Sequence, residues 1–224
     1  MPEPQNTEPI RFSSLGESAV LLDAASRDLA DDVQRRIWQL TSVASHWPDV
    51  RELVPGMNNL LVIFDPMQAD PVQLSHKLRQ AWNETREDAK LGRTIEIPVH
   101  YGGETGFDLA FLAQRHGLTI EEVVRLHSQA DYLVYAVGSQ PGFGYLAGLD
   151  GKLATPRREV PRKSVTAGSV MIGGAQAGVM ACTSPSGWHV LGRTDVRLFD
   201  PDRSPSVLLA PGDRIRFRVE SLTT

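Results

Sequence analysis

The sequence has one cysteine, Cys182, among its 224 residues. A single cysteine forms no disulfide within the chain and supplies no multi-cysteine metal site. No stretch approaches the ~20 continuous apolar residues that span a bilayer. The opening residues, MPEPQNTEPIRF, lack the basic and apolar regions of a secretory signal. We therefore expect a cytoplasmic protein without a disulfide framework, beginning with a short disordered lead-in.

Sequence motifs for bound metals and nucleotides are also missing. The six histidines show no H-x-x-x-H spacing and no C-x-x-C occurs, so no bound metal is predicted. The run Gly142 to Ala147 fits the pattern G-x-G-x-x-A, but Pro156 and Pro161 follow where the helix of a dinucleotide-binding turn has to run. No Gly-Lys-Ser/Thr loop and no G-x-S-x-G elbow is present. These absences exclude the standard nucleotide loops and give no local support to a hydrolase triad.

The hydrophobic pattern changes near residue 92. Before this point, short apolar runs typical of strands alternate with two segments of helical spacing, the second of which begins at Asp70-Pro71, a cap followed by proline at the first helical position. This alternation predicts a small α/β domain over residues 1–92. We expect the linker at Lys90 to Arg93.

The second part of the chain has a different pattern of predicted helices and strands. Short helices are expected at Asp108–His116, closed by Gly117, and after Thr119, which forms a capping-box pattern with Glu122. From residue 149 onward, short strand-like runs are separated by Gly, Pro and Asp. Strands at this spacing are typical of a barrel or a sandwich, so we predict a β-rich domain over residues 93–224.

Charge is distributed unevenly along the chain. Residues 1–151 carry 12 Lys and Arg against 21 Asp and Glu, whereas residues 152–218 carry 11 against 5. The densest basic cluster is PRREVPRK, in which prolines hold the chain extended and display Arg157, Arg158 and Arg162. Guanidinium groups of this kind suit a carboxylate or a phosphate. The alternative is a charged edge strand that opposes aggregation.

Several long motifs carry a family resemblance. The stretch that begins GSQPGFGYLAG at Gly138 and ends WHVLGRT at Thr194 closely resembles the allophanate hydrolase subunit 1 family. This family also covers the B-type subunit of the bacterial 5-oxoprolinase complex and the inhibitor of a sporulation histidine kinase. Earlier motifs stand in family order, and the resemblance spans about Arg11 to Val219; these motifs are SLGESAVLL, VPGMNNLLVIFDP, EIPVHYGGETGFDLAFLA and LHSQADYLVYAVG.

The resemblance implies an α+β fold and an assembly. The fold would be a small ferredoxin-like α/β domain followed by a cyclophilin-like β-barrel domain. Members act with a homologous second subunit, which is of the allophanate hydrolase subunit 2 type or is the C-type subunit of 5-oxoprolinase. In the 5-oxoprolinase complex, the two subunits together with a lactam-hydrolase-like third subunit would open 5-oxo-L-proline to L-glutamate at the expense of ATP. We therefore predict a hydrolase subunit that is inactive alone and shares ATP with its partners, with no nucleic acid or membrane involved.

The resemblance also implies site residues. We predict Arg157, Arg162 and His127 as catalytic residues, with an arginine holding a phosphate or the substrate carboxylate. Backbone N–H groups of the turn at 141–144 are expected to stabilise developing negative charge. The aromatic rings are expected to wall the flat substrate ring, or to be core or interface residues. The predicted substrate-binding residues are Pro141, Gly142, Phe143, Gly144, Tyr145, Gln176, Trp188 and Arg193.

Four positions depart from the residues usual in the family, and these departures bear on the pocket shape more than on the fold. A further group in family-matching segments is expected to include a proton-transfer residue, although Asp108 is equally well explained as a helix N-cap and His127 as a helix-end residue. The departures are Ser139, Ala177, Met180 and Ser186, and the proton-transfer candidates are His100, Glu104, Asp108 and His127.

Three functions remain open from the sequence. The first is a subunit of ATP-dependent 5-oxoprolinase. The second is a binding module that inhibits a histidine kinase by gripping a proline-containing segment in its barrel groove. The third is half of a biotin-dependent allophanate or urea carboxyltransferase, for which biotin would arrive on another protein because the chain has no Met-Lys-Met run.

Overall fold

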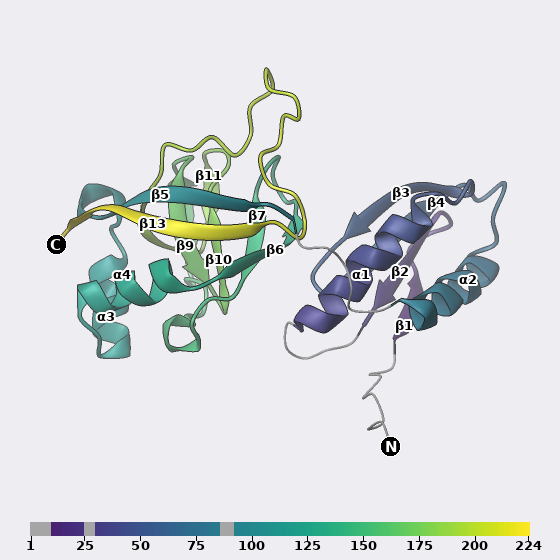
Figure 1. The fold of residues 1–224 in the computed structure, drawn as a ribbon, viewed down its shortest axis with the longest axis horizontal. Helices are drawn as coiled ribbons and strands as arrows, with labels where there is room; N and C mark the ends of the chain where they lie inside the picture. Colours follow the sequence, from purple (N-terminus) through teal and green to yellow (C-terminus); the bar gives the residue numbers. More distant parts are fainter. Residues whose placement is uncertain (1–9, 25–29, 86–91) are drawn as a thin grey trace. The chain divides into compact units, whose positions relative to one another are not determined.

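The chain forms two compact units, Met1–Lys90 and Leu91–Thr224 (Figure 1). The computed structural model describes residues 10–24, 30–85 and 92–224. The division lies two residues before the predicted boundary. Residues 1–9 of the expected lead-in, and two of the four residues of the expected linker, lie outside the described residues.

The first unit is a four-stranded antiparallel sheet with two helices. The strands lie in the order β1-β2-β4-β3. Side chains alternate along β2 and β4, so that one face of the sheet is buried against the helices. The elements are β1 (Arg11–Ser14), β2 (Ala19–Asp23), α1 (Asp31–Ala44), β3 (Val50–Pro55), β4 (Asn59–Phe64) and α2 (Pro71–Glu84).

The predicted start of α2 is confirmed. The Asp70 side chain accepts hydrogen bonds from the backbone N–H groups of Val72 and Gln73, and Pro71 occupies the first turn. The apolar stripe of this helix, Leu74, Leu78 and Trp82, is buried against the sheet. The cap and the stripe together place α2 on the same core as α1.

The ferredoxin-like detail is not confirmed. A ferredoxin-like unit runs β-α-β-β-α-β, whereas this unit runs β-β-α-β-β-α. The reason is local: β1 turns back tightly through residues 15–18 and pairs with β2. The sheet edge beside β2 is therefore taken by a strand from before it in the chain, and no strand after α2 is needed there.

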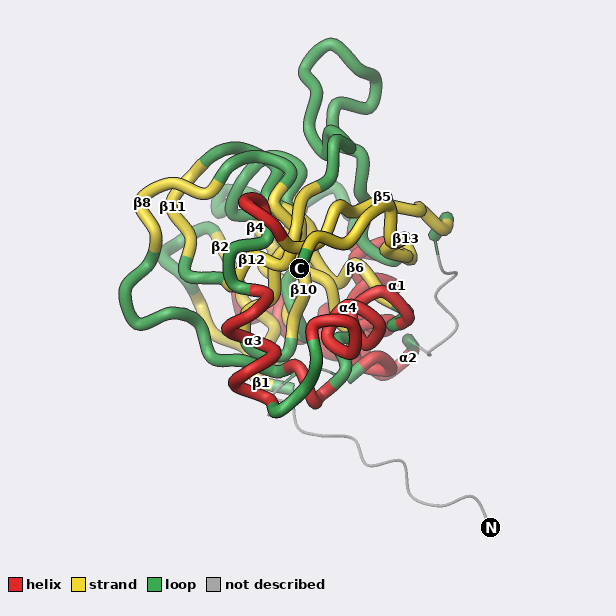
Figure 2. Tube along the Cα trace, turned by 90° about the vertical axis from the view of Figure 1, so that its left-hand side faces the viewer, coloured by secondary structure: helices red, strands yellow, loops and turns green. Residues whose placement is uncertain are grey.

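The second unit is a closed barrel of seven strands, which confirms the predicted barrel (Figures 1 and 2). Closure pairs every strand on both sides and leaves no open edge. The order around the barrel is β10-β7-β6-β13-β5-β12-β9, and β13 runs parallel to β5. The strands are β5 (Thr94–Gly102), β6 (Tyr132–Val137), β7 (Gly144–Ala147), β9 (Ser169–Gly173), β10 (Gln176–Val179), β12 (His189–Arg193) and β13 (Arg214–Thr223).

Shorter elements surround the barrel. A two-stranded sheet of β8 (Arg162–Val165) and β11 (Ser184–Ser186) stands beside it, with 3-10 turns η1 (Gly103–Thr105) and η2 (Gly151–Leu153). The segment between β12 and β13 projects away from the barrel (Figures 1 and 2). Two helices, α3 (Leu109–His116) and α4 (Ile120–Gln129), pack against the barrel strands.

The termini of both helices agree with the sequence. Gly117 ends α3 in the left-handed conformation at φ 65°, and the capping box of Thr119 and Glu122 begins α4. No helix in the described residues is long and apolar enough to cross a membrane.

Candidate functional site

The site begins with a tight turn between β6 and β7. Phe143 N donates to Gln140 O at 3.1 Å, and Gly142 has a φ of +80°. Proline followed by a glycine of positive φ is the combination that a type II turn requires. A Cβ on Gly142 would lie 2.9 Å from Leu198 O, so both the turn and the close packing need glycine here.

The turn offers fewer free donors than the sequence suggested. Pro141 has no N–H, the N–H of Phe143 closes the turn, and Gly138 N donates to Phe143 O at 3.0 Å. Gly144 belongs to β7, where it pairs with Val137. The predicted anion-stabilising role of this backbone stays a prediction, and the side chains around it are the more accessible polar groups.

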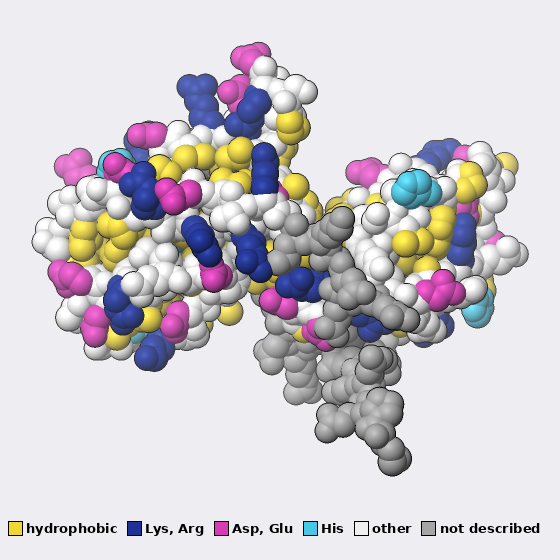
Figure 3. All heavy atoms as spheres, in the orientation of Figure 1, with side chains coloured by type: hydrophobic (Ala, Val, Ile, Leu, Met, Phe, Trp, Pro, Cys, Tyr) yellow, Lys and Arg dark blue, Asp and Glu magenta, His cyan; other side chains and the backbone are white. Residues whose placement is uncertain are grey.

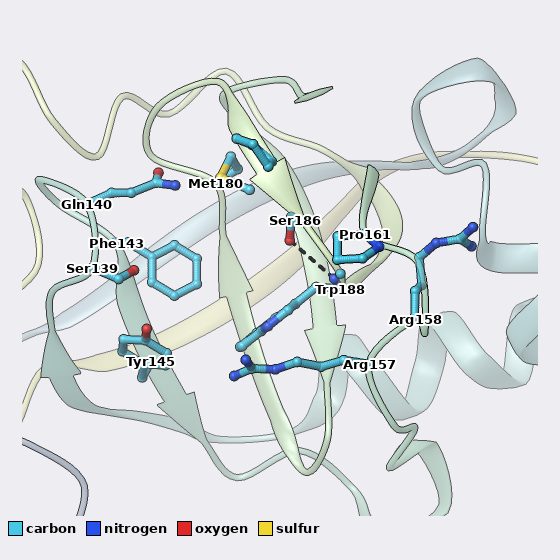
Figure 4. Close-up of a pocket in the computed structure, with 12 residues that line it drawn as sticks. Ser139, Gln140, Phe143, Tyr145, Arg157, Arg158, Pro161, Met180, Ser186 and Trp188 are labelled. Carbon is cyan, nitrogen blue, oxygen red and sulfur yellow. Dashed lines mark hydrogen bonds between the residues drawn. The ribbon is translucent and has the colours of Figure 1, made fainter. Parts of the chain in front are cut away.

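A cavity of about 340 Å³ opens beside this turn (Figure 4). Three aromatic rings line it, meeting edge to face: Phe143 lies 4.9 Å from Tyr145 and 5.7 Å from Trp188 between ring centroids. Such edge-to-face contacts stabilise aromatic clusters beyond their burial. Phe143 and Trp188 are buried, so these residues serve both as core and as cavity wall.

Two glycines leave room for the rings of Trp188 and Phe143. A Cβ on Gly173 would lie 2.7 Å from the Trp188 indole, and one on Gly178 would lie 3.0 Å from Phe143 Cζ. Real Cβ atoms do not approach ring atoms to 2.7 Å, so the missing side chain at 173 is what lets the indole lie against β9. Sequence reasoning identified both rings but not the glycines beneath them.

Adjacent arginines point in opposite directions from the extended segment before β8. Figure 4 shows Arg157 running along Trp188 toward Tyr145, whereas the guanidinium of Arg158 points away from the rings. The Arg157 guanidinium lies 5.6 Å from the Trp188 ring centroid, within cation–π range. Among the described residues, no hydrogen bond or ion pair holds the Arg157 side chain, and it is exposed. Arg157 therefore presents an uncommitted cation at the cavity.

Arg162 has a different position from the one predicted. Its guanidinium binds Asp108 in a bidentate pair, with N–O distances of 2.8 and 2.7 Å, and it does not line the cavity. The Asp108 carboxylate, 5% exposed, also accepts from Val190 N at 2.8 Å and lies 3.6 Å from an Arg158 nitrogen. Arg162 thus anchors its segment to the start of α3.

The explanation of Asp108 as a helix N-cap is confirmed for its position but not for its hydrogen bonding. Asp108 occupies the N-cap position of α3, but its side chain makes no capping hydrogen bond. Its oxygens are committed instead to two arginines and to the backbone of β12. A partner 54 residues away leaves no signal in local spacing, which is why the sequence pattern suggested the cap.

Two histidines hold the beginning of the arginine segment. His189 Nε2 lies 3.0 Å from Pro156 O, so this nitrogen carries the proton, and His116 Nε2 lies 2.8 Å from Thr155 Oγ1. Burial lowers the pKa of His116, and the charges of Arg115 and His189 lower it further. These contacts fix the backbone from which Arg157 extends.

His127 lies apart from the cavity. It is completely buried on α4, and its Nδ1 lies 2.8 Å from the Tyr101 hydroxyl, in a cluster with Tyr132 and Phe217. Burial lowers the pKa of His127 to about 3, and it raises the pKa of both tyrosines above the ordinary value. The structure therefore does not bring this predicted catalytic residue to the other site residues.

The remaining predicted residues fall elsewhere. Gln176 is buried on β10, and Arg193 lines a second cavity. His100 hydrogen-bonds Ser221 and lines another surface hollow, and Glu104 is exposed on η1. Among the described residues, no group of three or more His, Cys, Asp or Glu side chains is placed to hold a metal ion.

The cavity contains polar residues that were not predicted as site residues. Gln140 donates to Ser184 Oγ, which leaves Gln140 Oε1 without a partner among the described residues. Ser139 has a positive φ of 59°, and Ser186 accepts from Trp188 N. The signal that could have found Ser139 and Ser186 was present, because three of the four departures from the family pattern line this cavity; these are Ser139, Met180 and Ser186.

Comparison with known proteins identifies relatives over nearly the whole chain. The family model "Carboxyltransferase domain, subdomain C and D" matches residues 10–209. A protein of Escherichia coli O157:H7, named as the B-type subunit of 5-oxoprolinase, is 45% identical over 91% of this chain and 93% of its own length. A Bacillus subtilis (strain 168) protein of the same name is 32% identical over 92% and 91%.

Solved structures agree with this relationship. The protein TTHA0988 is 33% identical with a TM-score of 0.77, and the match covers 92% of this chain but only 40% of that one. A conserved uncharacterized protein of Pyrococcus horikoshii is 38% identical, with a TM-score of 0.57 over 94% of this chain and 98% of its own. The urea amidolyase of K. lactis has a TM-score of 0.80 at 18% identity over 99% of this chain and 15% of its own, a likeness of fold alone.

Proposed function

The chain belongs to the carboxyltransferase-domain family, subdomains C and D, together with relatives named as the B-type subunit of 5-oxoprolinase, and we propose that it is a subunit of an ATP-dependent 5-oxoprolinase. In this proposal the complex opens the lactam of 5-oxo-L-proline to give L-glutamate. The observation that carries it is the uncommitted guanidinium of Arg157 beside three aromatic rings in one cavity.

The cavity suits the chemistry of this substrate. 5-Oxoproline is a small flat ring that carries one carboxylate, a lactam N–H and a lactam carbonyl. The Arg157 fork matches the carboxylate, and the rings of Phe143, Tyr145 and Trp188 match the apolar faces of the ring. Each recognition element therefore has a counterpart in the substrate.

The polar atoms of the cavity complement the lactam itself. Gln140 Oε1 is an acceptor without a partner among the described residues, which suits the lactam N–H. Tyr145 lines the same cavity, and we propose that its hydroxyl donates to the lactam oxygen, on which negative charge grows as the amide is activated. In this arrangement the chain binds and orients the lactam.

The proposal assigns the remaining chemistry to other subunits. The chain has no Gly-Lys-Ser/Thr loop. Its relatives are each named as one subunit, which implies further subunits for those proteins. We propose that a homologous second subunit and a lactam-hydrolase-like third subunit share the ATP with this chain. The complex would then couple phosphorylation of the lactam to its opening.

Reconstitution tests this function. The full chain is mixed with the second and third subunits, and release of ADP and glutamate is measured with and without 5-oxoproline. We expect ADP release to depend on 5-oxoproline only when all three proteins are present. The absence of stimulation in the full mixture would overturn the proposal, and avidin-sensitive turnover of urea would replace it with a carboxyltransferase function.

Arg157 gives the test at the level of one residue. Loss of a charge-assisted hydrogen bond to the substrate costs about 1.5–3 kcal/mol, so Arg157→Ala should raise the KM for 5-oxoproline by about tenfold or more. Arg157→Lys should recover part of this loss, because it keeps the charge but not the fork. The matched control is Lys163→Ala, an exposed cation of the same segment that does not line the cavity. Equal KM values in wild type and Arg157→Ala would remove Arg157 from the site.

A further inference from the structure

A second cavity of about 370 Å³ lies on the same unit, next to the substrate cavity. Both are lined by Met180, which is only 3% exposed and separates them. The turn at Gly142 also packs closely against Leu198 and Phe199, which line the second cavity. The two cavities therefore share a wall and a turn.

Two arginines give the second cavity its charge. Arg193 reaches it from the end of β12 and Arg197 from the segment that follows. Arg193 lies 3.8 Å from the carboxylate of Asp195, whose side chain is 84% exposed, and such surface pairs contribute little. For the Arg197 guanidinium, the described residues offer no hydrogen bond or ion pair. Arg193, Arg197 and Asp195 thus line one cavity, and two cations against one exposed carboxylate leave its lining with a net positive charge.

The backbone around these arginines is fixed before any ligand arrives. The Arg203 guanidinium donates to the carbonyl oxygens of Arg197 and Leu198 at 3.2 Å each, so Arg203 is committed to holding this segment. Gly168 lies against the backbone beside Arg193: a Cβ on it would lie 2.3 Å from Thr194 O, so glycine permits the close approach of the two backbones. A preordered site loses less conformational freedom when it binds a ligand.

We propose that this second cavity is a phosphate-binding compartment, in which Arg193 and Arg197 hold the phosphate group of inorganic phosphate or of a nucleotide. Two guanidinium forks match a doubly charged group with several oxygens better than a single carboxylate does. The choice of phosphate rests on the proposed ATP-dependent function. The shared wall at Met180 would place that phosphate beside the lactam bound at Arg157.

Binding to the full chain, measured without turnover, tests the compartment. Inorganic phosphate, pyrophosphate and ATP are titrated separately by calorimetry at low salt. We expect the Arg193→Ala/Arg197→Ala double variant to bind at least about tenfold more weakly than wild type, with 5-oxoproline affinity kept. Tighter binding of ATP than of phosphate would indicate a nucleotide, and the reverse would indicate free phosphate; either supports the compartment.

The matched control removes the same charge elsewhere. Arg216 and Arg218 are exposed on β13 of the same unit, outside this cavity, so Arg216→Ala/Arg218→Ala should retain wild-type phosphate affinity. The proposal is overturned if wild type binds none of the three probes at millimolar concentration, or if both double variants weaken binding equally. If the wild-type chain binds phosphate but the reconstituted complex shows no ADP release that depends on 5-oxoproline, the result counts against the proposed function and not against the compartment.

Discussion

At the scale of single residues, Asp108 determines which of the three arginines near the cavity are paired with a carboxylate. Its carboxylate binds Arg162 in a bidentate pair and lies 3.6 Å from an Arg158 nitrogen, so that of the two arginines lining the cavity, Arg157 and Arg158, only Arg157 has no ion pair among the described residues. The three arginines form one basic cluster in the sequence but differ in the structure: Arg162 is an anchor, Arg158 lies near the same carboxylate, and Arg157 is unpaired among the residues that the structure describes. The division depends on one buried acid from another part of the chain.

Replacing this acid should destabilise the second unit. Asp108→Ala leaves the mostly buried Arg162 guanidinium without its carboxylate and Val190 N without its acceptor, a loss of about 2–4 kcal/mol in the free energy of unfolding. Asp131→Ala is the control, because its pair with Arg216 is mostly exposed and should change stability by under about 1 kcal/mol. Similar unfolding curves in urea for both variants would contradict the anchoring role.

The lowered pKa of the buried His127 predicts how the free energy of unfolding depends on pH. The folded ring stays neutral down to a pKa of about 3, whereas the unfolded ring takes up a proton near 6.5. Unfolding therefore binds a proton between these values, and the free energy of unfolding falls as the pH drops from about 6.5, by up to about 1.4 kcal/mol per pH unit. His127→Phe should flatten this slope between about pH 5 and 6.5, as measured by urea unfolding at several pH values. A slope equal to that of wild type would show that another group titrates.

At the scale of elements, the turn between β6 and β7 controls the shape of the cavity. Gly142 needs both its positive φ and the absence of a Cβ, because Leu198 O lies so close. Gly174, between β9 and β10, also has a positive φ, but no atom lies within 4 Å of its would-be Cβ. A comparison of substitutions at the two glycines therefore distinguishes the effect of backbone strain from the effect of steric contact.

Alanine at each glycine should have different effects. Gly174→Ala should lower the free energy of unfolding by about 1 kcal/mol, from the left-handed backbone alone. Gly142→Ala should lower it by clearly more, and should also weaken 5-oxoproline binding because the turn shifts against Leu198. Thermal unfolding and calorimetric titration of both variants provide the comparison. Equal stability losses with unchanged binding would show that the turn tolerates a side chain.

At the scale of the whole molecule, two separate cores predict two unfolding events. Leu78 is completely buried in the first core and Ile172 in the second. Leu78→Ala and Ile172→Ala should each destabilise their own unit by about 2–5 kcal/mol and leave the other nearly unchanged, since each unit has its own core. Differential scanning calorimetry should show two transitions, of which each variant lowers one. A single transition lowered by both variants would mean that the units unfold together.

Features set by neighbouring residues were predictable from the sequence. The cap at Asp70, the capping box at Thr119, the left-handed Gly117 and the proline–glycine turn at 141–142 all depend on contacts within a few positions. The strand-rich second part, the aromatic residues and the exposed Arg157 were likewise visible as composition and pattern. Hydrogen bonds between near neighbours and side-chain periodicity are the physical content of such patterns.

The features that only the tertiary structure decided are pairings across long stretches of chain. The fold of the second unit brings Asp108 to Arg162, places His127 among buried aromatics, and puts Arg157 and Arg193 in two cavities that share Met180. The order of residues therefore determined which groups were available, namely a pocket turn, three rings and a set of arginines. The tertiary fold of the second unit determined which of those groups neutralise each other and which stay free to bind, because it fixes distances between residues that lie far apart in the sequence.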